Sequence, residues 1–149
     1  MTAQKPHPAE APVRWRAWIG EKWRSWSDSG GDPDRRIGRD FLLELLTIYW
    51  ATQTVTSSMR DYFDNRWHGI SLGPDDVVTE PTAIAGFTHE FAPEGRPPRE
   101  WAERLYHVRR WTPMPRGGHF AAVEEPRLLA QDIAGFFSSL PEGARKGPV

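Results

Sequence analysis

Histidines and carboxylates are the side chains of this sequence that could do acid–base chemistry. Cysteine is absent from the 149 residues, which excludes disulfides, thiolate metal sites and cysteine nucleophiles. The histidines show no paired metal-ligand spacing such as His-Glu-x-x-His, so we assign no metal and no cofactor. They are His7, His68, His89, His107 and His119. A histidine can act as a general base when an acid orients it, so the positions of these residue types decide what the chain could do.

The local sequence leaves the roles of three residues open. His119 lies in a loop just before a helix, where a histidine needs no catalytic role. Glu90 would be an ordinary solvated carboxylate, but it follows a strand, and open α/β sheets place their sites at that end of their strands. Tyr62 lies on an amphipathic stretch beside Phe63, so it can be assigned to core packing as readily as to a chemical role. We interpret His89 as a structural neighbour of Glu90.

The arginines of the C-terminal half favour a solvated surface over a phosphate site. Arg109, Arg110 and Arg116 alternate with acidic residues along the sequence. The net charge of −1 likewise gives no electrostatic reason to expect nucleic acid as a partner.

Helical patterns dominate the first half of the chain. Aromatic and apolar residues recur at spacings of three to four over residues 13–26, which predicts one packed face of a helix. These residues are Trp15, Trp18, Ile19, Trp23 and Trp26. Glycine, proline and short polar residues predict a loop over 27–34. A second helix is expected from Asp40, interpreted as its N-cap, with a break near 53–58, where β-branched residues lower helix propensity.

Two strands and two helices are expected in the second half. Residues 77–78, and then 82–87 after Pro81, predict one buried strand. Residues 108–114 predict a second one. Pro97 and Pro98 introduce a helix over about 99–106. Glu124, Glu125 and Pro126 open the last helix, where acidic residues suit the helix dipole. Its expected apolar face comprises Leu128, Leu129, Ile133, Phe136 and Phe137.

This order implies an α/β fold with two parallel strands joined by a crossover. Two strands make an unsatisfactory parallel sheet, so we expect the chain to be the end of something larger. Residues 1–12 are expected to be a disordered leader and 141–149 a flexible tail. The apolar runs are too short for a membrane span of about 18 residues. The N-terminus does not resemble a secretory signal, and we expect a cytoplasmic protein.

Several separated motifs resemble the epoxide hydrolases of the α/β-hydrolase superfamily, the microsomal-type branch in particular. Residues 116–126, Arg-Gly-Gly-His-Phe-Ala-Ala-Val-Glu-Glu-Pro, resemble the histidine segment that closes these enzymes. Residues 80–90 resemble the strand and loop that carry the catalytic acid. Residues 48–62 resemble the exit of the lid, and residues 18–28 its entry helix. The resemblance implies a lid-like helical segment over 13–70, then the last two β/α units of the core over 71–140, with an incomplete sheet.

The resemblance also implies a reaction, in which an epoxide and water give a vicinal diol through an aspartyl ester. His119 matches the general base, Glu90 its orienting acid and Tyr62 a tyrosine that holds the epoxide oxygen. Glu90 precedes His119 by 29 residues, a gap that spans one helix and one strand and suits two adjacent strand ends. The family's nucleophile segment has no counterpart. Asp32 is rejected as a substitute because Pro33 has no N–H to line an oxyanion hole.

We therefore expect a truncated epoxide hydrolase that lacks turnover on its own and takes an epoxide only when an N-terminal half completes it. Two alternatives stay open. One is a non-catalytic interaction module that self-associates through an exposed strand edge. The other is part of a different α/β-hydrolase, such as a dehalogenase or an esterase, because a histidine and an acid serve many chemistries on this fold.

Overall fold

The computed structural model describes residues 11–67, 71–73, 75–90 and 97–142. They belong to two compact units. Of the described residues, those up to Ser25 and those within Ser29–Leu72 form the first unit, and Trp26–Asp28 together with those from Gly73 onward form the second. Residues 1–10 of the expected leader and 143–149 of the expected tail lie outside the described residues.

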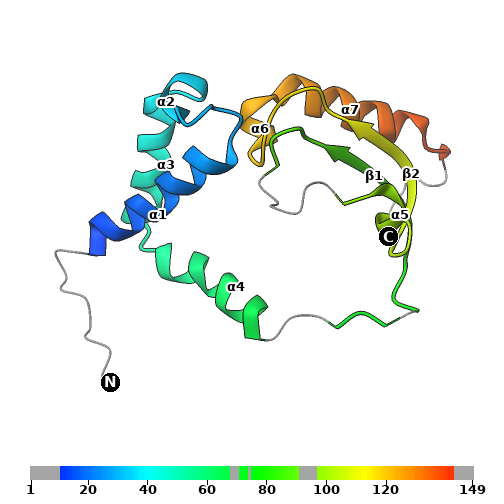
Figure 1. The fold of residues 1–149 in the computed structure, drawn as a ribbon, viewed down its shortest axis with the longest axis horizontal. Helices are drawn as coiled ribbons and strands as arrows, with labels where there is room; N and C mark the ends of the chain where they lie inside the picture. Colours follow the sequence, from blue (N-terminus) through cyan, green and yellow to red (C-terminus); the bar gives the residue numbers. More distant parts are fainter. Residues whose placement is uncertain (1–10, 68–70, 74, 91–96, 143–149) are drawn as a thin grey trace. The chain divides into compact units, whose positions relative to one another are not determined.

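The described part of the first unit contains four helices, which Figure 1 labels. They are α1 (Ala11–Trp26), α2 (Pro33–Arg36), α3 (Arg39–Ala51) and α4 (Val55–Trp67). Helix α1 begins two residues before the predicted start. Part of its predicted aromatic face packs as expected: Trp23 is buried and meets Phe41 of α3 edge-on, with ring centroids 5.6 Å apart. The side chain of Trp15 lies outside the described residues.

The start of α3 differs from the prediction. Gly38 is the N-cap residue, with a φ of 108° that favours glycine, and Asp40 lies inside the first turn. Asp40 as N-cap was therefore wrong. The N–H groups of Ile37 and Gly38 still bond to α2 carbonyls, and α3 follows directly, with its N-cap two residues before the predicted one.

The break expected near 53–58 is confirmed at 53–54, whereas residues 55–58 already belong to α4. Helix α3 ends at Ala51, Gln53 adopts a positive φ of 56°, and α4 begins at Val55.

Among its described residues, the second unit contains a two-stranded parallel sheet and three helices, labelled in Figure 1. Its elements are β1 (Val78–Gly86), α5 (Arg99–Ala102), β2 (Tyr106–Pro113), α6 (Ala121–Glu124) and α7 (Pro126–Ser139). The predicted parallel pairing is confirmed. The helix expected over 99–106 ends at Ala102, because Leu105 and Tyr106 already pair with Val78.

Helix α7 is held against β2 by hydrogen bonds to the buried carboxylate of Asp132. Asp132 accepts hydrogen bonds from Arg110 Nε at 2.7 Å and from Thr112 Oγ1 at 2.8 Å. Phe136 of α7 is buried as expected, but Ile133 and Phe137 are exposed. The predicted apolar face was therefore too wide, since a single pair of strands covers only one narrow stripe of the helix.

The described helices include none that is both long enough and apolar enough to span a membrane.

Candidate acid–base site

His119 and Glu90 form a hydrogen-bonded pair. His119 Nδ1 lies 2.7 Å from Glu90 Oε1. Glu90 follows β1 and His119 follows β2, so the parallel register brings both residues to the carboxyl ends of neighbouring strands. Both side chains are partly exposed, at 39 % for His119 and 35 % for Glu90. The pair is thus accessible to a reactant as well as internally oriented.

The loops that carry the pair are joined through their backbones. His89 forms a parallel bridge with Gly118 beyond the ends of the strands, and the His89 N–H donates to the Gly117 carbonyl at 3.0 Å. This bridge extends the β1–β2 pairing to the residues next to Glu90 and His119. The spacing of the loops that carry Glu90 and His119 is therefore set by backbone pairing.

A segment far away in the sequence also holds the histidine loop. The His119 N–H donates to the Trp26 carbonyl at 2.9 Å, and the Trp26 ring meets the imidazole edge-on with centroids 5.0 Å apart. Asp28 accepts a hydrogen bond from the Gly117 N–H at 2.9 Å, and its other oxygen lies 3.2 Å from His89 Nδ1. Sequence reasoning missed Asp28, because nothing in its local sequence reports a contact with residues so distant.

Glu124 also contacts the histidine loop, although the sequence had assigned it to the start of the last helix. Its buried carboxylate accepts three backbone hydrogen bonds, from Asp28, Gly118 and Phe120, at 2.7, 3.1 and 3.0 Å. Glu124 ends α6 and α7 begins only at Pro126, so the prediction that Glu124 opens the last helix was wrong. The prediction relied on the acidic pair before Pro126, because acidic residues are common at a helix start, where they suit the helix dipole. That pattern does not distinguish a residue that opens a helix from one that binds backbone N–H groups of a loop.

Two glycines let these segments approach closely. A Cβ on Gly118 would lie 2.5 Å from the Trp26 carbonyl oxygen and 2.9 Å from the Asp28 nitrogen. Gly117 has a φ of 99°, and a Cβ there would lie 2.8 Å from the Phe87 ring. A larger side chain at either position would displace the histidine loop.

The arginines beside this site pair with carboxylates. Arg116 Nε donates to Glu125 at 2.7 Å, which raises the pKa of the guanidinium above its ordinary value. Arg110 pairs with Asp132. Arg110 and Arg116 were expected on a solvated surface, and the structure shows each of them paired with a carboxylate.

Tyr62 lies in the first unit, on α4. Its ring meets Trp18 of α1 edge-on, with centroids 5.4 Å apart, and its side chain is exposed. The structure thus brings His119 and Glu90 together within the second unit, and the role of Tyr62 stays a prediction.

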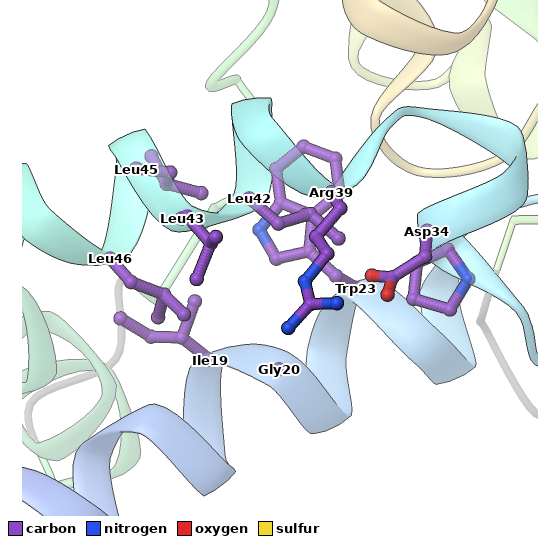
Figure 2. Close-up of a pocket in the computed structure, with 10 residues that line it drawn as sticks. Ile19, Gly20, Trp23, Asp34, Arg39, Leu42, Leu43, Leu45 and Leu46 are labelled. Carbon is purple, nitrogen blue, oxygen red and sulfur yellow. The ribbon is translucent and has the colours of Figure 1, made fainter.

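The first unit contains an apolar pocket of about 430 Å³ between α1 and α3 (Figure 2). Leucines of α3 line it together with Ile19 and Trp23 of α1, and Asp34 and Arg39 supply its charged groups. Within the described part of the chain, histidine and acidic side chains form no cluster of three or more that could hold a metal ion.

Comparisons with known proteins give the context of this site. No protein-family model matches the chain. It is 37 % identical over 133 residues to a putative epoxide hydrolase of Stigmatella aurantiaca, covering 89 % of this chain and 29 % of that protein. It is 35 % identical over 142 residues to epoxide hydrolase 1 of Sus scrofa, covering 89 % and 31 %.

A solved structure that resembles this chain is also that of an epoxide hydrolase. An enantioselective mutant of the epoxide hydrolase from Aspergillus niger superimposes with a TM-score of 0.69 at 27 % identity, covering 87 % of this chain and 31 % of that one. The chain thus has part of an α/β-hydrolase fold, as expected. Within that class it is a relative of the epoxide hydrolases, and the resemblance predicted from its motifs is confirmed. It spans about 30 % of the length of the relatives it matches.

Proposed function

We propose that this chain is the part of an epoxide hydrolase that carries the acid–base pair for hydrolysis of the covalent ester. The observation that carries this proposal is the 2.7 Å contact between His119 Nδ1 and Glu90 Oε1 at adjacent strand ends. A carboxylate only accepts hydrogen bonds, so Nδ1 carries the proton and Nε2 is the basic nitrogen of the ring.

In the proposed reaction an aspartate attacks an epoxide carbon, the C–O bond of the ring breaks, and an alkyl ester forms. His119 Nε2 then takes a proton from water as the water oxygen attacks the ester carbonyl. Cleavage of the acyl C–O bond releases the vicinal diol, whose two oxygens take up the two protons of the water, one of them returned by the His119 imidazolium, and this restores the aspartate and the neutral imidazole. Glu90 fixes the imidazole tautomer and stabilises the imidazolium that forms.

The proposal assigns the nucleophile to a segment outside these 149 residues; the length of the relatives, about three times that of the matched region, supports this assignment. The chain alone is then inactive, since members of a catalytic triad act as a unit. Tyr62 is proposed to donate a hydrogen bond to the epoxide oxygen. A cytoplasmic location also stays a prediction.

The test uses this chain joined to the N-terminal part of the Stigmatella aurantiaca relative, called the completed enzyme below. His119→Ala should lower its epoxide turnover by at least about 100-fold, the usual contribution of a general base. His107→Ala is the matched control, since His107 lies on β2 and contacts the Thr79 carbonyl instead. Epoxide turnover by the isolated chain that His119→Ala abolishes would contradict the proposal. Preferential turnover of esters or haloalkanes by the completed enzyme would favour the other hydrolase classes.

A second candidate function is self-association. In the described residues β1 and β2 pair only with each other, so each strand keeps an open edge. Helix α4 also exposes large apolar side chains, among them Phe63 and Trp67. A dimeric or larger mass of the isolated chain in solution would support this function, and a monomeric mass would contradict it.

A further inference from the structure

We propose that Glu124 is a positioning residue for His119, acting by fixing both segments that hold the histidine loop. This inference rests on the proposed function for its catalytic meaning, but its geometry stands on the described residues alone. All of its contacts lie within the second unit.

The hydrogen bonds of Glu124 surround the histidine. One carboxylate oxygen accepts from the Phe120 N–H, immediately after His119. The other oxygen accepts from the Gly118 N–H, immediately before His119, and from the Asp28 N–H. The backbone on both sides of the catalytic side chain is therefore bound by one carboxylate.

The bond to Asp28 extends this control to a second segment. Trp26, two residues before Asp28, accepts the His119 N–H and places its ring against the imidazole. Glu124 thus fixes the loop and also the segment on which the loop rests. Release of this carboxylate would loosen both supports at once.

Burial makes the arrangement depend on the charge of Glu124. The residue is 5 % exposed, and a buried carboxylate is costly unless its oxygens are bonded. Three N–H donors meet that need, and charge-assisted bonds of this kind are about twice as strong as neutral ones. A glutamine at this position has one acceptor oxygen, and its NH₂ group would face backbone N–H groups.

The experiment compares the isolated wild-type chain with Glu124→Gln by NMR. In the wild type, the Trp26 ring should shift the carbon-bound ring protons of His119, and the two rings should show a through-space contact. In Glu124→Gln we expect that contact and the ring-current shift to be lost. Amide hydrogen exchange at Gly118 and Phe120 should become at least about tenfold faster, as expected for a lost charge-assisted bond.

Asp132→Asn is the matched control. Asp132 is equally buried, but it bonds to side chains of β2, away from the histidine loop. The control should lower stability and leave the His119 signals in place. Glu124→Asp, which keeps the charge on a shorter side chain, should give an intermediate change and covers the case in which Glu124→Gln fails to fold.

Unchanged His119 and amide signals in both Glu124 variants would overturn the proposal. An equal change in Asp132→Asn would overturn it too, because the effect would then be general destabilisation. These readouts need no turnover, so they are separate from the test of function. In the completed enzyme, Glu124→Gln should lower kcat by about tenfold or more and leave KM nearly unchanged. If His119→Ala left turnover intact, the proposed function would fail while the positioning by Glu124 still stood.

Discussion

The backbone N–H of His119 donates a hydrogen bond to the carbonyl of Trp26, 2.9 Å away. Trp26 is the last residue of α1, yet it packs with the histidine loop in the second unit. The orientation of His119 therefore depends on a residue that strand pairing alone would not supply.

Glu90→Gln should reduce turnover of the completed enzyme by roughly 10²- to 10⁴-fold and leave the fold intact. The amide can still contact Nδ1 but no longer stabilises the imidazolium or fixes the tautomer. Steady-state rates measure the loss, and circular dichroism checks the fold. Glu100→Gln, at an exposed carboxylate in the first turn of α5, is the control and should change neither. Equal rates for Glu90→Gln and the wild type would remove Glu90 from the site.

Gly118→Ala should destabilise the second unit by about 1–3 kcal/mol, the range for forcing extra volume into a packed site. Its new methyl group would overlap the Trp26 carbonyl and the Asp28 nitrogen. Gly20→Ala is the opposite control, because Gly20 lies in α1 with no atom within 4 Å of a Cβ, and it should stabilise by up to about 1 kcal/mol. Urea unfolding compares the two. Equal free energies of unfolding for both variants would show that the loop is not closely packed.

Phe136→Ala should lower the free energy of unfolding by about 3–5 kcal/mol, because it empties a buried position. Phe137→Ala, at the next residue of α7, should cost less than about 1 kcal/mol. The side chains differ in exposure, at 6 % for Phe136 and 56 % for Phe137. Thermal or urea unfolding followed by tryptophan fluorescence distinguishes them. Similar losses would mean that Phe137 is covered in solution, as self-association would do.

Tyr62→Phe should leave stability within about 0.5 kcal/mol of the wild type, because the ring that meets Trp18 is kept. If Tyr62 donates to the epoxide oxygen, turnover of the completed enzyme should fall by about 10²- to 10³-fold, as for loss of an oxyanion donor. Tyr106→Phe on β2 is the control and should leave the rate unchanged. A normal rate in Tyr62→Phe would assign the tyrosine to packing alone.

Local signals were sufficient for most elements of the fold. The tryptophan spacing predicted α1, and the short apolar runs predicted β1 and β2. The parallel order of the strands then predicted that Glu90 and His119 lie together at the carboxyl ends of the two strands. These features depend on periodicity and chain order, which the sequence displays directly.

Long-range hydrogen bonds were beyond such reasoning. In the sequence, Glu124 looks like an ordinary acidic residue beside a helix start. Only the structure shows its hydrogen bonds to Asp28, Gly118 and Phe120. The error at Asp40 has the same origin, since the positive φ of Gly38 decided where α3 begins. The apolar face of α7 was overestimated because the width of its covering sheet does not appear in the helix sequence.

The most direct test of the central claim is mass spectrometry of the completed enzyme after mixing with an epoxide. His119 is proposed to act only after the ester has formed, so His119→Ala should form the ester but fail to hydrolyse it. We predict a mass increase equal to one epoxide on the nucleophile segment of His119→Ala that persists after the free epoxide is removed, and an adduct that decays under the same conditions with His107→Ala. Rapid loss of the adduct from His119→Ala, at the rate of the unsubstituted enzyme, would contradict the role of His119 as the base.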